Sequence, residues 1–219
     1  MYATRVKITE WRTLVDQGRY SSSSAFQRVE QDIRAAVTDV VWPPGSDRFT
    51  IHPESGKKRG EGNGVVPIKK SFAESLEQRG WELERRAPKT EEIEQKVVKG
   101  SRPGAFDGHL SFPGNDPLPF AVEWETGNIS SSHRAINRIG LGMKVGYLSG
   151  GVLVVPSAEL ARYLTDRIGN APELLPYHPL WEEWTFQKFG YFGIVTVEHD
   201  AESFDVARIP KGKDGRAES

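Results

Sequence analysis

The sequence predicts a mixed α/β domain with one central β-sheet and helices on both faces of that sheet. Three observations lead to this fold class. Segments with helical spacing of apolar residues alternate along the chain with short runs typical of strands. The 219 residues are 37% hydrophobic, which is enough for one substantial core. No internal repeat or linker divides the sequence, so we interpret residues 1–219 as a single domain.

The first half of the chain predicts two helices on either side of a loop. In residues 22–41, Phe26, Val29 and Ile33 recur at helical spacing after a serine run that can cap the first turn. The expected elements are a helix over residues 22–41, a short strand over 49–51, a charged and glycine-rich loop over 53–64, a helix from Pro67 to near Gly80, a strand over 82–86 and a short charged helix over 89–98.

The second half alternates strands and helices. Residues 113–117, Pro-Gly-Asn-Asp-Pro, have strong turn chemistry, and Gly151–Val155 is an apolar run typical of a buried strand. Residues 210–219 lack apolar anchors, so we expect a tail that is flexible without a ligand. The expected elements are strands over 107–112 and 120–126, a helix over 130–144, a strand over 151–155, a helix over 157–168 and a strand over 191–197.

Composition excludes several classes of protein. The chain has no cysteine, which excludes disulfides and thiolate catalysis. It has no apolar run of about 18 residues and no apolar signal core at the N-terminus, so we expect a cytoplasmic protein without a membrane partner. The formal net charge of −1 argues only weakly against a nucleic-acid partner, because metal-binding carboxylates can offset a basic cleft.

The most informative stretch, Phe120–Arg134, reads FAVEWETGNISSSHR. Because side chains alternate along a strand, Glu123 and Glu125 face one side of it and Trp124 faces the other. If Asp107 lies on the neighbouring strand, three carboxylates converge at the strand ends. Hard divalent cations such as Mg²⁺ prefer oxygen ligands of this kind and support in-line displacement at a phosphodiester.

This arrangement follows the logic of the PD-(D/E)XK nuclease fold, in which the last motif position is usually Lys and here is Glu125. A carboxylate there can orient or deprotonate the attacking water. Taken alone, the three acids are a weak signal, because acidic residues are often solvated or paired with arginine. The polar segment that follows, with Asn128, Ser130 and Arg134, indicates a nuclease that cuts at a chosen place.

Several blocks between residues 49 and 215 are similar, in the same order, to one known family. They are Phe49–Ile51, Asn63–Lys69, Val122–Arg134, Tyr163–Arg167, Glu173–Leu174, Pro176–Tyr177 and Ile209–Gly212. Through these blocks the chain resembles the BamHI family of type II restriction endonucleases. The resemblance implies a restriction-endonuclease-like PD-(D/E)XK fold and a homodimer that clamps double-stranded DNA. It also implies cleavage of each strand with Mg²⁺, for which Mn²⁺ can substitute.

The resemblance further implies roles for the acidic residues. Asp107 and Glu123 match metal ligands, and the backbone carbonyl of Trp124 would be a further ligand. Glu125 matches the catalytic carboxylate that stands where related enzymes have lysine. These four residues would therefore form the centre at which DNA is cut.

Two features of the resemblance are open. Glu84 matches a fourth acidic residue of the site, but the preceding helix is one residue shorter here, and Glu82 is the competing candidate. The segment over residues 178–184, which in the family carries acidic residues that join the subunits, differs here, whereas Lys144 is retained. We therefore expect a homodimer whose salt bridges differ from those of the family.

The base-reading positions of the family also match. Asn128, Ser130 and Arg134 match residues that contact bases in the major groove, and Asp166 and Arg167 match the pair that reads the outermost G·C. Arg can donate bidentately to guanine, Asp can accept from cytosine, and Asn can do both. The resemblance thus implies cleavage at G^GATCC, with 5′-GATC overhangs and 5′-phosphates. It also implies a bacterial host with a protecting DNA methyltransferase.

Plainer interpretations remain for several of these residues. Ser130 and its neighbours could only cap the following helix, and Asp166 could form a local ion pair with Arg167. Lys69 and Lys70 could contact phosphates or could form a solvated helix face. For the whole chain, the alternatives are a catalytically silent, sequence-specific DNA-binding protein and a structure-selective DNA repair nuclease on the same fold.

Overall fold

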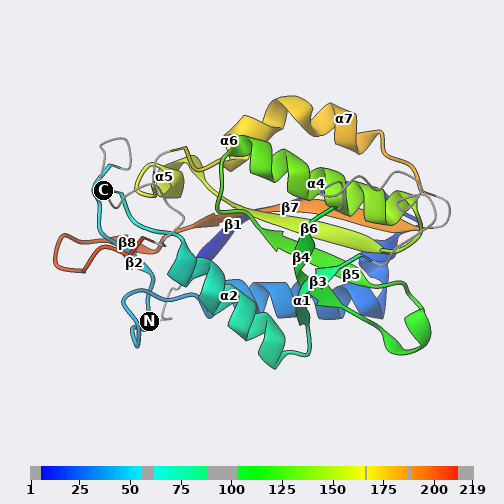
Figure 1. Ribbon diagram of the computed structural model, residues 1–219, viewed down its shortest axis with the longest axis horizontal. Coiled ribbons are helices and arrows are strands. Elements are labelled where there is room, and N and C mark those ends of the chain that lie inside the picture. The colour runs from blue at the N-terminus through cyan, green and yellow to red at the C-terminus, as the bar shows by residue number, and fades with distance from the viewer. Residues whose placement is uncertain (1–5, 56–61, 88–102, 166, 187–188, 212–219) are drawn as a thin grey trace.

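The computed structural model describes residues 6–55, 62–87, 103–165, 167–186 and 189–211. These residues form a central mixed sheet with helices on both faces, which confirms the predicted fold class (Figure 1). The helix expected over residues 89–98 and most of the predicted tail, from residue 212 on, lie outside the described residues. None of the described helices is long and apolar enough to cross a membrane.

The strands of the central sheet lie in the order β1 (Lys7–Gln17), β7 (Gly190–Glu198), β6 (Gly150–Pro156), β5 (Phe120–Trp124), β4 (Ala105–Leu110) and β3 (Glu82–Arg86). β5, β6 and β7 run parallel and are buried almost throughout, as expected for a sheet centre that helices cover on both faces. The outer pairs β1–β7, β4–β5 and β3–β4 are antiparallel. β2 (Thr50–Ile51) and β8 (Ala201–Glu202) form a separate small parallel sheet.

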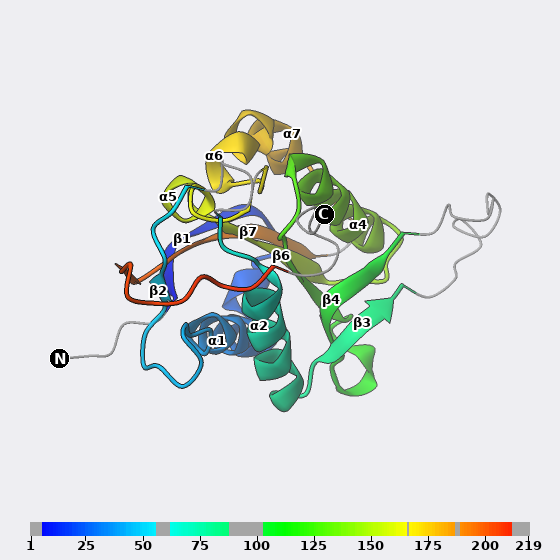
Figure 2. The ribbon, with the colours of Figure 1, turned by 60° about the vertical axis from the view of Figure 1, so that its left-hand side comes forward.

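Helices cover the two faces of the sheet in separate groups (Figure 2). One face carries α1 (Ser24–Thr38) and α2 (Val66–Gln78). The other face carries α4 (Ile129–Lys144), α6 (Ala171–Leu174) and α7 (His178–Glu182). The remaining elements are α5 (Ala158–Ala161) and the short 3₁₀ turns η1 (Tyr20–Ser22), η2 (Pro113–Asn115) and η3 (Leu175–Tyr177).

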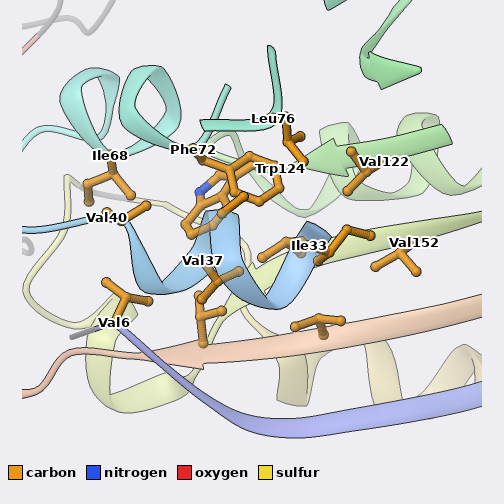
Figure 3. Close-up of a cluster of buried hydrophobic side chains, with 14 of the residues drawn as sticks. Val6, Ile33, Val37, Val40, Ile68, Phe72, Leu76, Val122, Trp124 and Val152 are labelled. Carbon is orange, nitrogen blue, oxygen red and sulfur yellow. The ribbon is translucent and has the colours of Figure 1, made fainter. Parts of the chain in front are cut away.

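The hydrophobic core that contains residues of α1 and α2 also holds the end of β5 in place. The rings of Phe72 and Trp124 lie 4.6 Å apart, between α2 and α1 and next to Ile33 and Leu76 (Figure 3). Burial of a large apolar side chain contributes about 1.5–3 kcal/mol to stability. Because Trp124 is the last residue of β5 and is part of this core, the backbone on either side of it has a defined position.

The helix expected over residues 157–168 is wrong beyond its first turn, because α5 ends at Ala161. Tyr163 and Leu164 are buried instead of continuing the helix. The backbone carbonyl of Tyr163 accepts hydrogen bonds from the backbone N–H and the side-chain amide of Asn63, each at 2.8 Å. A partner that is distant in sequence therefore overrides the local helical spacing.

Two parts of the fold carry little sequence signal. β1 is an edge strand with mostly exposed or half-buried residues, and its pairing with β7 has two register shifts, so it lacks regular alternation. The segment from α6 through η3 to α7 consists of helical pieces of three to five residues, each with a proline in its first turn. Neither pattern meets the periodicity that identifies a strand or helix from sequence.

Asn63 and Gly64 join the C-terminal segment to the start of α2. Asn63 is fully buried; its side-chain amide donates to the carbonyls of His52 and Tyr163, and its side-chain oxygen accepts from the N–H of Ile209 at 3.1 Å. The N–H of Gly64 donates to the carbonyl of Ile209 at 2.8 Å. These bonds satisfy the buried polar groups and fasten three distant segments at one point.

Candidate active site

Strands β4 and β5 bring the first two predicted acids together. Asp107 and Glu123 are 9% and 3% exposed. The Oδ2 atom of Asp107 accepts a hydrogen bond from the backbone N–H of Trp124 at 2.9 Å, which ties the first acid to the strand of the second. The two acids therefore form one buried pair at the centre of the sheet.

Each acid of this pair is matched by a cation from a helix. Lys69 on α2 reaches Asp107, with Nζ 2.6 Å from Oδ1. Arg138 on α4 donates from Nε to Oε1 of Glu123 at 2.7 Å. Burial, followed by the charge of Asp107, raises the pKa of Glu123 to about 8 against the opposing effect of both cations. The two acids of the site are thus buried, and their negative charges are balanced by Lys69 and Arg138.

Glu125 lies directly after β5, at the edge of the same cluster. Its Oε1 atom accepts a hydrogen bond from the N–H of Gly127 at 2.5 Å. Burial raises the pKa of Glu125 more than this hydrogen bond lowers it, and the charges of Asp107 and Lys69 also act on it. The third acid therefore shares the electrostatic environment of the first two.

The fourth acidic position has two candidates, Glu84 and Glu82, and both lie on β3. Glu84 lies between Leu83 and Arg85, whose partners Gly108 and Phe106 flank Asp107, and it has a left-handed φ of 51°. Burial lowers the pKa of Lys69, but the surrounding carboxylates, Glu84 among them, outweigh burial and raise it. Glu82 instead pairs with Arg85, with Oε2 3.2 Å from Nη1.

The donor chemistry of this cluster fits a divalent cation. Among the residues that the structure describes, no three His, Asp or Glu side chains converge closely enough to hold a metal ion in the present arrangement. Asp107 and Glu123 nevertheless supply buried carboxylate oxygens whose mutual repulsion a hard cation would relieve. In the structure, Lys69 and Arg138 balance the negative charges of these two carboxylates.

The first three predicted reading residues lie at the start of α4. Asn128 caps the helix, with its Oδ1 atom accepting from the N–H of Ser131 at 3.2 Å. Arg134 is exposed and donates to Oγ of Ser131 at 3.0 Å, and Ser130 is exposed on the first turn. The helix cap is therefore Asn128 and not Ser130, and the start of the helix faces solvent.

The second predicted reading pair is half described. Asp166 lies outside the described residues, whereas Arg167 is exposed with a left-handed φ of 70°. Shortly after it, the N–H of Gly169 donates to the carbonyl of Gly127 at 2.9 Å. This bond brings the segment that carries Arg167 against the turn that precedes Asn128, although the two are far apart in sequence.

Sequence reasoning missed one residue of the site and left another undecided. Arg138 carries no motif signal, and only the packing of α4 on the sheet directs it to Glu123. Lys69 stands in a block similar to the family, but the sequence does not distinguish a solvated lysine from one that contacts an acid. Its neighbour Lys70 is the solvated one, with a side chain 71% exposed.

Comparisons with known proteins identify relatives that span most of this chain. A family model described as restriction endonuclease BamHI matches residues 6–216. Type II restriction enzyme OkrAI of Oceanobacter kriegii is 41% identical over 212 residues, which are 97% of this chain and 99% of that relative. Type II restriction enzyme BamHI of Bacillus amyloliquefaciens is 32% identical over 197 residues, 89% of this chain and 85% of that relative.

A solved structure supports the fold independently of sequence. The crystal structure of restriction endonuclease BglII complexed with a DNA 16-mer superimposes with a TM-score of 0.56. The match covers 88% of this chain and 79% of that chain at 10% sequence identity. At so low an identity the match concerns the arrangement of the sheet and helices.

Proposed function

This chain belongs to the BamHI family of type II restriction endonucleases, and from this membership we propose that it cuts both strands of duplex DNA at G^GATCC. Its relatives are named type II restriction enzymes, so it is a site-specific deoxyribonuclease. Enzymes of this kind generally use divalent metal ions. The observation that carries the proposal is the direct connection, through Thr126 and Gly127, between the buried acids and the exposed start of α4.

In this proposal the acids divide into metal ligands and a water-positioning group. Asp107 and Glu123 would hold Mg²⁺, for which Mn²⁺ would substitute, and Glu84 and the backbone carbonyl of Trp124 would assist. A bound divalent cation stabilises the negative charge that develops on the phosphoryl oxygens. Glu125 orients or deprotonates the attacking water. Water attacks phosphorus in line with the leaving 3′-oxygen, which accounts for ends with 5′-phosphates.

Recognition is proposed for the residues that follow the cluster. Asn128, Ser130 and Arg134 read bases in the major groove, and Asp166 and Arg167 read the outermost G·C. The exposed start of α4 and its contact with the segment that carries Arg167 support this assignment. Each bidentate base contact provides about 1–3 kcal/mol of discrimination. We further propose that the enzyme works in a bacterial cytoplasm, where a DNA methyltransferase protects the host sites.

Digestion of a plasmid of known sequence tests the proposed site. With Mg²⁺, the mapped ends are expected to be 5′-GATC overhangs at every GGATCC, and omission of the metal is expected to abolish cleavage. Cuts at another fixed sequence would still be those of a type II restriction endonuclease, but they would refute the proposed specificity for GGATCC. Binding without cuts would favour a silent DNA-binding protein, and cuts at flaps or junctions would favour a repair nuclease.

Replacement of Glu84 by Gln is expected to lower the rate of cleavage by about 10–100-fold, because losing a charged group that supports a metal site typically has this effect. Glu82→Gln is the matched control, since Glu82 pairs with Arg85 on the same strand. Single-turnover rates on a GGATCC duplex provide the measurement. Equal losses in the two variants would refute the preference for Glu84, and a loss only in Glu82→Gln would assign the role to Glu82.

We propose that the active form is a homodimer that uses the helical layer of α4, η3 and α7. His133 on α4 contacts Tyr177 of η3, with ring centroids 4.4 Å apart, so these elements form one layer. A contiguous group of exposed apolar side chains marks a protein–protein interaction site. The exposed apolar side chains of this layer are Leu141, Leu175, Tyr177 and Leu180, of which Leu180 is 63% exposed.

Leu180→Glu is expected to weaken the dimer by about 2 kcal/mol or more, because association would bury an unpaired charge. Sedimentation over a range of protein concentrations measures the change. Phe204→Glu is the control, since Phe204 is equally apolar and 69% exposed but lies beyond β8, outside this layer. If Leu180→Glu sediments like the unmodified protein, the proposed interface is wrong.

A further inference from the structure

The buried acids of the site already carry cations of the protein itself. Lys69 reaches Asp107 with Nζ 2.6 Å from Oδ1, and Arg138 reaches Glu123 at 2.7 Å. An acidic pair buried to this degree needs a compensating positive charge. The two protein cations supply it in the described arrangement. Oδ1 of Asp107 is taken by Lys69 and Oδ2 accepts the N–H of Trp124, so a divalent cation that binds Asp107 competes with Lys69.

The two cations differ in how firmly they are held. The side chain of Arg138 is 19% exposed, and its guanidinium lies over the ring of Phe106, 5.8 Å from the centroid. A Cβ atom added to Gly104 would lie 2.3 Å from Nη1 of Arg138, so the backbone also encloses it. The side chain of Lys69 is 35% exposed and has a flexible stem near the start of α2. Lys69 is therefore the cation that can leave.

We propose that Lys69 is an internal counter-ion that stabilises Asp107 in the free enzyme and competes with the divalent cation for that carboxylate. This inference rests on the proposed role of Asp107 as a metal ligand. The ammonium neutralises the buried acid when no metal is bound and turns outward when a metal arrives. Lys69 thus lowers the affinity of the free enzyme for metal while it keeps the empty site stable.

Calcium titration of the DNA-free protein tests the competition. Ca²⁺ is a hard cation that prefers carboxylate oxygens, and calorimetry reports its dissociation constant without any cleavage reaction. Lys69→Met is expected to bind Ca²⁺ about tenfold more tightly than the unmodified enzyme, because the metal no longer displaces a paired ammonium and linked binding events are typically coupled by about this factor. Lys69→Arg, which retains the cation, and Lys70→Met are expected to match the unmodified enzyme.

Thermal unfolding provides a second measurement on the same variants. Lys69→Met is expected to melt at a lower temperature without metal and to gain more from added Ca²⁺ than the unmodified enzyme, because ligand binding stabilises the folded state in proportion to affinity. Lys69→Gln replaces Lys69→Met if the latter does not fold. Lys70 is exposed and pairs with Glu74 at 3.6 Å, so Lys70→Met controls for loss of surface charge on α2.

Asp107→Asn separates failure of this inference from failure of the proposed metal site. If Asp107→Asn abolishes Ca²⁺ binding and Lys69→Met leaves the affinity unchanged or weaker, the counter-ion role is wrong and the metal site stands. If Asp107→Asn binds Ca²⁺ like the unmodified enzyme, Asp107 is not a ligand and both ideas fall. If Lys69→Met and Lys70→Met increase the affinity for Ca²⁺ equally, the effect comes from the lower positive charge of the protein surface, and the inference is wrong.

Discussion

Glu125→Gln should lower the single-turnover rate of DNA cleavage by about 10²–10⁴-fold, the usual contribution of a positioned acid or base. Glu125 follows β5 directly, and the adjoining Trp124 is held in the core. Glutamine has the same length and can still accept the hydrogen bond from the N–H of Gly127. The substitution therefore removes the charge that we propose acts on water and retains the turn that leads to Asn128.

Binding and cleavage need to be measured separately for this variant. Gel-shift titration with a GGATCC duplex is expected to give an unchanged dissociation constant, because the start of α4 is intact. Glu74→Gln, on the outer surface of α2, serves as the control and should cleave at the original rate. If Glu125→Gln loses binding and cleavage to the same extent, Glu125 supports the turn at Thr126 and Gly127 and does not act in the cleavage step.

Gly64→Ala should destabilise the folded protein by about 3 kcal/mol, at the upper end of the range for overpacking. A Cβ atom at position 64 would lie 2.0 Å from the carbonyl oxygen of Pro210 and 2.8 Å from Cα of Lys211. Both neighbours are backbone atoms, so no side chain can rotate to make room. The hydrogen bond from Gly64 to Ile209 would be lost as the C-terminal segment moves away.

Urea unfolding measures this loss, and Asn63→Ala reports on the same junction from the adjoining position. Asn63 accepts a hydrogen bond from the N–H of Ile209, so each single variant releases the same segment. The double variant is therefore expected to be less destabilised than the sum of the two single variants. Strict additivity, or a Gly64→Ala protein as stable as the original, would show that the C-terminal segment is not fastened here.

The unit from β5 to α4 could be predicted from sequence because it is built from neighbouring residues. Strand alternation gives Glu123 and Trp124 opposite directions, and a polar residue before a helix caps it. The structure agrees on both points, although the cap is Asn128 and not a serine of the following run. Local geometry of this kind needs no information from distant parts of the chain.

The region after β6 shows where local reasoning ends. Residues 157–168 have helical spacing, but α5 stops after one turn because Asn63 binds the carbonyl of Tyr163. The edge strand β1 shows the reverse case. Its sequence lacks the regular alternation of a strand, yet it forms one because it pairs with β7. In both cases a long-range hydrogen-bond partner decides the outcome.

The same division applies to the site. Which acids are present, their order on the strand and the polar helix start that follows them can be read directly from the residues. That Lys69 and Arg138 meet those acids, and that Glu84 lies between the partners of the residues flanking Asp107, is visible only in the fold. The reason is physical: these contacts join α2, α4 and β3 to the centre of the sheet, and their geometry depends on packing between elements that are distant in sequence.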